Sequence, residues 1–164
     1  MRFGGYTRAM HYTVEPVGIV RAERTHAEDD YWGGVQARIV LADSYEADAL
    51  KGLEEFSHVE IIFLFHEVEA ERIVHGARHP RNNAAWPPVG IFAQRGKNRP
   101  NRIGSTTCRL ISVEGTALVV AELDAIDGTP VVDIKPVMQE FLPRGPLRQP
   151  PWTGELMRDY WQTR

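Results

Sequence analysis

Short runs of strand-forming residues, separated by turn residues, occupy most of this sequence and leave little length for helices. These runs cover residues 12–20, 36–41, 59–65, 89–93, 108–113, 116–123 and 130–134. Between the fifth and sixth runs, the pair Glu114-Gly115 is a typical β-hairpin signal. Because helices do not alternate regularly with the strands, the pattern predicts a mainly β fold: a single antiparallel β-barrel domain with a few short helices.

Helical signals are confined to two places. Ser44 could cap a short helix over residues 45–56, and a second helix could run over residues 153–161. A chain of 164 residues is long enough to bury one core, so one globular domain is expected. Along the chain we expect a flexible N-terminal leader at residues 1–11, the barrel at residues 12–143 and a C-terminal tail with a short helix at residues 144–164.

Positive charge is concentrated in one span, from Arg72 to Val113, which contains no Asp or Glu. Its basic residues are Arg72, Arg78, Arg81, Arg95, Lys97, Arg99, Arg102 and Arg109. The whole chain has a net charge of -3, which argues against a protein that coats nucleic acid without specificity. The basic span therefore predicts a local electropositive surface that meets an anionic partner.

The single cysteine, Cys108, excludes an intrachain disulfide and a thiolate cluster around a metal. This usage suits a reducing cytoplasm, which is the expected location. His75 and His79 stand four residues apart, but Gly76 and Pro80 disfavour the helix that would aim both at one metal. No metal site is expected. No apolar run reaches the roughly 18 residues of a membrane span, so no membrane partner is expected either.

The centre of the basic span is a turn-rich loop between Phe92 and Gly104. Glycine and proline along this loop allow the backbone to approach a ligand closely. Arg95 and Arg99 could each hold a carboxylate or a phosphate through two parallel hydrogen bonds. On spacing alone, however, a solvated basic loop is the somewhat better interpretation.

A second motif runs from Asp127 to Pro136. Asp127-Gly128 predicts a turn, and Asp133 and Lys135 then project from one face of a strand, because strand side chains alternate. The two carboxylates could bind hydroxyl or amino groups or receive a proton. From these residues alone, a turn followed by a surface ion pair is the stronger interpretation.

His66 lies at the exit of an apolar run that begins near Phe56. A histidine in this position could donate a hydrogen bond to a ligand or stack on it. A structural histidine bonded to a nearby carbonyl is at least as common, so both interpretations stay open. Cys108 begins a predicted strand and is interpreted as a small core residue rather than as a nucleophile.

Two segments together resemble a known family. They are Phe92-Ala-Gln-Arg-Gly-Lys-Asn-Arg-Pro-Asn-Arg-Ile-Gly104 and Asp127-Gly-Thr-Pro-Val-Val-Asp-Ile-Lys-Pro136. Both resemble segments of the TsaA-like family, which includes the TrmO tRNA methyltransferases. The resemblance extends to Pro16-Val-Gly-Ile19, to Gln36 and to the run that ends at His66, so it covers residues 12–136.

The resemblance implies a small β-barrel that binds S-adenosylmethionine without a Rossmann fold. It implies a homodimer with the cofactor near the subunit interface. The reaction that it implies is N6-methylation of threonylcarbamoyladenosine beside the anticodon, so the expected partners are the anticodon loop of tRNA and a second subunit.

Individual residues have expected roles, of which the cofactor contacts are implied by the resemblance, and the RNA and catalytic roles are hypotheses from the basic span and the Asp127–Pro136 motif. The cofactor would be held by Gln36, His66, Arg95, Ser105, Asp127, Gly128 and Thr129. The phosphates of RNA would be held by Lys97, Arg99 and Arg102. Asp133 or Lys135 would orient the acceptor nitrogen or relay its proton, as the catalytic pair.

The sequence departs from the common family pattern at the basic loop. Gln94 stands where Thr is usual, Lys97-Asn98 replace Pro-Phe, and Arg102 replaces a proline. Longer bacterial members carry a further domain after the barrel, where this sequence has residues 137–164. Two alternatives to the tRNA enzyme therefore stay open: a non-catalytic S-adenosylmethionine sensor, and a methyltransferase acting on another RNA or on a small molecule.

Overall fold

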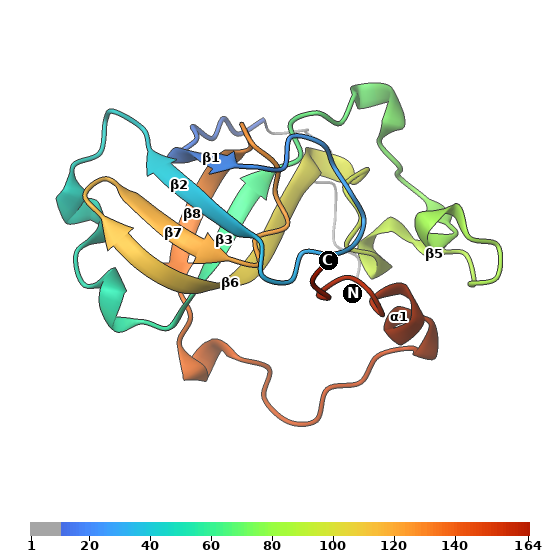
Figure 1. The fold of residues 1–164 in the computed structure, drawn as a ribbon. Helices are drawn as coiled ribbons and strands as arrows, with labels where there is room; N and C mark the ends of the chain where they lie inside the picture. The colour runs from blue at the N-terminus through green and yellow to red at the C-terminus, as the bar shows by residue number, and fades with distance from the viewer. Residues whose placement is uncertain (1–10) are drawn as a thin grey trace, which may run out of the picture.

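The computed structural model describes residues 11–164, and its centre is a closed barrel of antiparallel strands (Figure 1). The order around the barrel is β1 (Gly18–Ala22), β2 (Gln36–Leu41), β7 (Ala117–Ala121), β6 (Ile103–Glu114), β3 (His58–Leu64) and β8 (Pro130–Pro136). Pairing of β8 with β1 closes the barrel. The predicted mainly β fold is confirmed, whereas the leader predicted at residues 1–11 lies, apart from His11, outside the described residues.

The remaining elements are short. β4 (Ala77–Arg78) and β5 (Val89–Gly90) form a separate two-stranded ladder beside the barrel. Single 3-10 turns occur at η1 (Ala47–Leu50), η2 (Leu53–Glu55), η3 (Ala70–Arg72), η4 (Pro80–Asn82), η5 (Ile91–Ala93), η6 (Pro100–Arg102) and η7 (Gln139–Phe141). The α-helix α1 (Pro151–Leu156) lies near the C-terminus. Within residues 11–164, no helix is long and apolar enough to cross a membrane.

The helix predicted over residues 45–56 is wrong. Two 3-10 turns, η1 and η2, replace it, because Gly52 between them has a left-handed backbone with a φ of +85°. A helix cannot continue through this conformation, which glycine adopts at little cost. Ser44 is not a cap either, since Glu46 occupies the cap position of η1 and makes no side-chain capping bond. The second predicted helix is shorter and earlier than expected, because Pro151 starts it in the first turn that proline favours.

Several strand boundaries also differ from the sequence pattern. The strand predicted at residues 89–93 is wrong beyond Gly90, because the chain there curls into the 3-10 turn η5. β1 starts at Gly18, later than expected, and β6 starts at Ile103, earlier than expected. The early start of β6 follows from its partner, since every residue from Ile103 to Arg109 pairs with β3.

The hairpin between β6 and β7 is confirmed. Glu114 pairs with Ala117 across a two-residue turn at Gly115 and Thr116. The register shifts between Leu110 and Ser112, where β6 carries a bulge. A bulge bends a strand, and the bend allows this long strand to follow β3 at one end of the barrel and β7 at the other.

Alternate residues of each strand face the inside of the barrel and form its core. Ile39, Ile61, Phe63 and Leu118 are among the largest side chains that are fully buried. Residues 122–126, which follow β7, add Leu123 and Ala125 to the same core. The core therefore fixes both the strands and the segment that leads into the Asp127 turn.

Cys108 lies inside this core and is fully buried. Burial raises the pKa of its thiol, and the nearby charges of Asp124 and Glu122 raise it further. The thiol therefore stays protonated at neutral pH, and the thiolate is the reactive form. Its position agrees with the interpretation of Cys108 as a small core residue.

We expect Cys108 to be inert in the native protein. Iodoacetamide at mildly alkaline pH should leave the native thiol unmodified, since alkylation needs an accessible thiolate. The same reagent should modify it fully in denaturant, which serves as the control. Mass spectrometry measures both results, and rapid alkylation of the native protein would contradict the burial of this side chain.

Gly104 allows two aromatic rings to pack beneath β6. A Cβ atom at this position would lie 2.7 Å from two ring carbons of Phe63 and 2.9 Å from a ring carbon of Phe65. These two rings also contact each other edge to face, with centroids 5.3 Å apart. The ring of Phe63 cannot move away easily, because it is fully buried.

Replacement of Gly104 by alanine should therefore destabilise the barrel. We expect G104A to lower the free energy of unfolding by about 1–3 kcal/mol, the usual cost of overpacking a core. Urea denaturation measures the change. G76A is the matched control, because a Cβ atom at Gly76 meets nothing within 4 Å. Equal stability of the two variants would contradict the packing of Phe63 and Phe65 against Gly104.

Candidate functional site

Most of the predicted site residues lie around one end of the barrel. β1 and β3 end there, and β6 and β8 begin there, because neighbouring strands run in opposite directions. The β4–β5 ladder and the C-terminal segment lie on the same side of the barrel (Figure 1). The loops from this end therefore bring together residues that are far apart in the sequence.

His66 faces the backbone of the Asp127–Thr129 turn. A Cβ atom at Gly128 would lie 3.9 Å from Nε2 of His66, and Gly128 has a φ of +78° that favours glycine. The turn is held to β1 by two backbone bonds: Gly128 donates to Val20 at 2.9 Å, and Val20 donates to Thr129 at 2.9 Å. Thr129 is buried. The ring nitrogen of His66 therefore lies beside a rigid glycine turn.

The carboxylate of Asp127 completes the edge of β1. β8 pairs with only the first residues of β1, and the backbone N–H of Ala22 beyond them donates to Oδ1 of Asp127 at 3.1 Å. The other oxygen, Oδ2, lies 3.9 Å from Nη1 of Arg21. A carboxylate has about four acceptor sites, so Asp127 can still accept bonds from a ligand.

Arg95 and Ser105 are in direct contact. Nη2 of Arg95 donates to the backbone carbonyl of Ser105 at 2.5 Å and lies 3.4 Å from its hydroxyl oxygen. Ser105 lies near the start of β6 and pairs with Ile62 of β3. The side chain of Arg95 is exposed, and its remaining guanidinium donors are available to an anion.

Asp133 and Lys135 form an ion pair on the outer face of β8. The hydrogen bond and the charge of Asp133 raise the pKa of Lys135. Asp133 pairs with Ile62, and Ile62 pairs on its other side with Ser105. The three residues thus form one row across β8, β3 and β6, in which the outer two are separated by about 10 Å, twice the spacing between strands. The predicted catalytic pair is closer in the sheet to Ser105 than to the His66 turn.

Gln36 is exposed at the start of β2. It lines a shallow groove on the outside of the barrel together with Arg21 and Arg38. In the described part of the chain, no hydrogen bond joins Gln36 to His66, Arg95 or Ser105. The structure therefore does not bring Gln36 into direct contact with the other predicted cofactor residues.

The basic loop uses two of its arginines to hold itself in place. Arg99 donates to the carbonyl of Gln94 at 2.8 Å, and Arg102 donates to the carbonyl of Val68 at 2.7 Å. Each guanidinium has five N–H donors, so both can also contact an external anion. Lys97 is exposed on the same loop.

Gln94, which departs from the family pattern, has a structural role. Its side chain is buried, and Nε2 donates to the carbonyls of Arg78 at 3.0 Å and Val89 at 2.9 Å. These two residues are partners in the β4–β5 ladder. An amide group has two N–H donors and a threonine hydroxyl has one, so Gln94 can bridge both strands where threonine could not.

A polar network beside the site has no counterpart in the sequence prediction. Asp124 accepts hydrogen bonds from the hydroxyls of Thr106 and Tyr160. Burial raises the pKa of Tyr160, and the charge of Asp124 raises it further, so the phenol stays protonated and donates. Thr106 directly follows Ser105, so Asp124 links the Arg95–Ser105 contact to the C-terminal segment.

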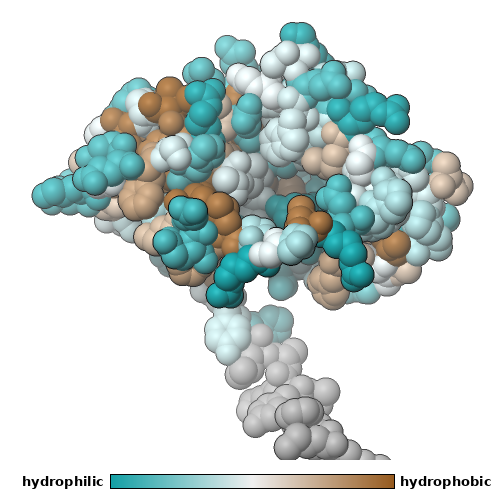
Figure 2. Space-filling model, turned by 90° about the horizontal axis from the view of Figure 1, so that it is seen from below, coloured by the Kyte–Doolittle hydropathy of each residue, from teal (hydrophilic) through white to brown (hydrophobic). Residues whose placement is uncertain are grey.

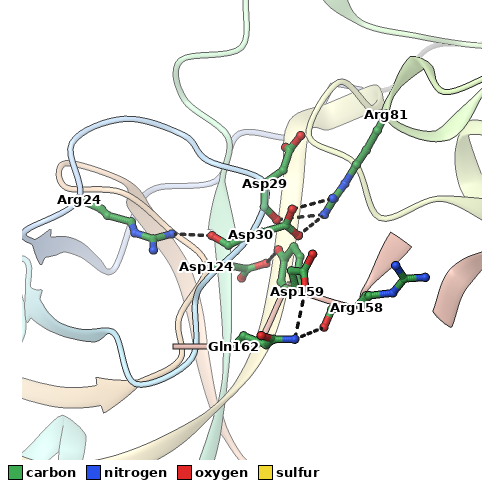
Figure 3. A network of polar contacts seen from close by, with 9 residues as sticks. Arg24, Asp29, Asp30, Arg81, Asp124, Arg158, Asp159 and Gln162 are labelled. Atoms are coloured by element: carbon green, nitrogen blue, oxygen red, sulfur yellow. Dashed lines mark hydrogen bonds and ion pairs between the residues drawn. The ribbon is translucent and has the colours of Figure 1, made fainter. Parts of the chain in front are cut away.

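The C-terminal segment docks on residues 29–35. Tyr31 donates its backbone N–H to Asp159 at 3.1 Å, and Trp32 donates to Tyr160 at 2.8 Å. Figure 3 shows Asp30 beside this segment, in contact with Arg81 and Arg24 from two sides. Nothing in the local sequence pattern could have revealed these contacts, because each joins residues that are distant along the chain and belong to no motif.

Replacement of Tyr160 by phenylalanine tests this network. Y160F keeps the ring and removes the hydroxyl, so it should lower the free energy of unfolding by about 2 kcal/mol, the usual value for a hydrogen bond to a charged group. Y45F is the matched control, because Tyr45 is partly exposed and donates no side-chain hydrogen bond among the described residues. Urea denaturation of both variants provides the measurement. A change no larger than that of Y45F would show that the Asp124 contact contributes little.

The site contains no arrangement suited to a metal. Among residues 11–164, no group of three or more His, Cys, Asp or Glu side chains could hold a metal ion. The groups that the site residues present are guanidinium, imidazole, hydroxyl and carboxylate groups and the backbone of the Gly128 turn.

Comparison with known proteins places this arrangement in a family. Residues 25–141 match the tRNA-methyltransferase O N-terminal domain. The tRNA (adenine(37)-N6)-methyltransferase of Mus musculus is 45% identical over 93 residues, which are 57% of this chain and 21% of the mouse protein. A protein of Pyrococcus abyssi named as a probable S-adenosyl-L-methionine-binding protein is 37% identical over 100 residues, which are 58% of this chain and 49% of that protein.

A solved structure agrees with these sequence matches. The crystal structure of TrmO from Pseudomonas aeruginosa superposes with a TM-score of 0.67 and 29% sequence identity, covering 85% of this chain and 62% of that one. The chain thus spans less than two thirds of the length of each of these relatives. On the evidence of the matched residues and of the barrel that carries them, the chain belongs to the family of tRNA-methyltransferase O N-terminal domains.

Proposed function

We propose that this protein is an S-adenosylmethionine-dependent methyltransferase that methylates N6 of threonylcarbamoyladenosine at position 37 of tRNA. One observation carries the proposal: the Arg95–Ser105 contact and the His66–Gly128 turn flank the end of the same strand, β3. The family membership supports the assignment, as do the relatives named for this reaction and for this cofactor.

The residues present fit S-adenosylmethionine, which offers a carboxylate, an amino group, ribose hydroxyls and an adenine ring. Arg95 has free guanidinium donors for the carboxylate. Asp127 has free acceptor sites for hydroxyl or amino groups. Gly128 has no side chain that would keep a ligand away from His66. Ser105, Thr129 and the more distant Gln36 complete the proposed set of cofactor contacts.

Bound S-adenosylmethionine supplies an electrophilic methyl group on a sulfonium centre. The residues of the chain contribute mainly position, since the acceptor nitrogen must lie in line with that group. Asp133 can accept the proton that the nitrogen loses. Lys135 is expected to stay protonated at neutral pH, because Asp133 raises its pKa, and it can orient the acceptor but cannot take its proton.

The proposed macromolecular partner is the anticodon loop of tRNA. Lys97, Arg99 and Arg102 would contact its phosphates, and all three belong to the span without acidic residues. The proposed location is the cytoplasm, where tRNA is modified. A free cysteine such as Cys108 stays reduced there.

A second copy of the chain is the other proposed partner. The segment between β8 and α1 is extended and exposes apolar side chains, with Phe141 85% and Leu147 77% accessible. Apolar residues are also visible among hydrophilic ones in the view from below, from which this segment is seen (Figure 2). A contiguous exposed apolar patch can mark an interface with another chain, and we propose that these side chains belong to such an interface.

The second candidate function is a sensor that binds S-adenosylmethionine without transferring its methyl group. The placement of the acidic groups favours it: Asp127 already accepts the N–H of Ala22, and Asp133 is paired with Lys135 on the outer face of β8. Neither Asp127 nor Asp133 is thus free of protein partners to take a proton. Ligand binding without transfer would distinguish the sensor from the enzyme.

The deciding experiment combines ligand binding with methyl transfer. Calorimetry should detect heat on addition of S-adenosylmethionine. R95A should weaken the affinity about tenfold, because a hydrogen bond to a charged group is lost. R148A is the matched control, since Arg148 is exposed on the C-terminal segment. With cofactor carrying a labelled methyl group and tRNA lacking the N6-methyl group, label should appear in N6-methyl-threonylcarbamoyladenosine.

The outcomes separate the alternatives. Binding with transfer supports the enzyme, and binding without transfer to tRNA, other RNA or small molecules supports the sensor. Absence of any heat of binding would exclude both. Equal cofactor affinity of R95A and R148A would remove Arg95 from the proposed site.

A further inference from the structure

Arg78 is a partly buried cation that forms no ion pair and donates no side-chain hydrogen bond within residues 11–164. It pairs with Val89 in the β4–β5 ladder, and its backbone carbonyl accepts a bond from Gln94. Nε of its guanidinium is buried and has no hydrogen-bond partner in the part of the chain that the structure describes. A buried donor left unpaired costs free energy, and a charged donor costs more, so this position calls for an acceptor that the protein itself does not provide.

The other arginines of the basic span either have a hydrogen-bond partner or are exposed to solvent. Arg81 binds Asp30, Arg95 binds Ser105, Arg99 binds Gln94 and Arg102 binds Val68. Arg72 and Arg109 are exposed and are hydrated by solvent. Within the span, which lies wholly in the described part of the chain, Arg78 is thus the arginine whose guanidinium has a buried nitrogen, Nε, without a hydrogen-bond partner.

The backbone at Gly96 lies over the end of the Arg78 side chain. A Cβ atom at Gly96 would lie 3.5 Å from Nη2 of Arg78. The backbone N–H groups of Gly96 and Lys97 donate to no acceptor found in residues 11–164. The end of the Arg78 guanidinium thus lies beside a stretch of backbone that has two N–H groups without an acceptor in residues 11–164, and the exposed Lys97 adds a further positive charge nearby in the chain. Guanidinium and backbone N–H groups are donors that bind an oxyanion.

We propose that Arg78, together with the Gly96–Lys97 backbone, forms a binding site for a backbone phosphate of the RNA substrate. The proposal rests on the proposed function in one respect, since that function supplies the polyanion. The carboxylate of S-adenosylmethionine is the other possible source of an oxyanion. The position favours RNA: Arg78 lies on the β4–β5 ladder beside the barrel, whereas the His66–Gly128 turn and Ser105 lie on the barrel itself.

Charge neutralisation at Arg78 is the first test. R78Q should weaken the binding of fluorescently labelled tRNA about tenfold near 0.1 M salt, and the slope of log affinity against log salt should fall by about one unit in magnitude. The affinity for S-adenosylmethionine should stay unchanged. R109Q is the matched control: it removes the same charge from the exposed side chain of Arg109 on the outside of β6. A general loss of electrostatic attraction would affect both variants equally.

A second variant keeps the charge and blocks access to it. At 3.5 Å the added methyl group of G96A makes an ordinary van der Waals contact with Arg78, so the fold should be retained. The methyl group would cover the end of the guanidinium and should weaken tRNA binding, again without an effect on cofactor affinity. Thermal unfolding of R78Q and G96A checks that both variants are folded. If R78Q is unfolded, the tRNA affinity of G96A tests the site instead.

Each outcome is decisive. Weaker tRNA binding by R78Q and G96A, with R109Q near the wild type, supports the site. Loss of cofactor affinity with unchanged tRNA affinity would overturn it in favour of the cofactor carboxylate. If R78Q and G96A bind tRNA as tightly as the wild type, and the wild type methylates tRNA, the Arg78 site is overturned and the proposed function is not. A wild type that binds S-adenosylmethionine but neither binds nor methylates tRNA would overturn the proposed function and this site with it.

Discussion

The pairing of β3 on both of its edges is the constraint on which the rest of the structure depends. β3 binds β6 along one edge and β8 along the other, and it joins the two halves of the barrel. Its register sets Ser105 and Asp133 in one row through Ile62, and its end delivers His66 to the Gly128 turn. A shift of one residue would turn these side chains to the opposite face, so the hydrophobic alternation that buries Ile61 and Phe63 also positions the site.

The basic span is not a uniform charged surface. Part of its charge stabilises the loop itself, because Arg99 and Arg102 donate to backbone carbonyls that would otherwise lack partners. Another part ties the loop to the barrel through Arg95 and Ser105. The remaining donors of these arginines, together with Arg78 and Lys97, are left for an anionic partner. Charge density along a sequence therefore does not show which donors of a folded loop are already used within the protein.

Most of the barrel could be predicted from the sequence, because alternation and turn residues are local signals. The β6–β7 hairpin at Gly115 is one example. The helix over residues 45–56 could not be excluded, since the left-handed state of Gly52 depends on the surrounding fold. The motifs located the residues of the candidate site, and their roles stay predictions. The Asp124–Tyr160 contact left no signal, because two isolated polar residues do not reveal that they meet.

The Asp124–Tyr160 contact also has a consequence for the order in which the chain can fold during synthesis. β8 is the last strand to leave the ribosome, and the barrel can close only when it meets β1 near the start of the chain. Tyr160 emerges later still, so Asp124 must remain hydrated until then. Pairings between such distant segments form slowly. A nascent chain therefore exposes one edge of β1 and one edge of β3 until β8 has emerged, and Asp124 meets Tyr160 only after that.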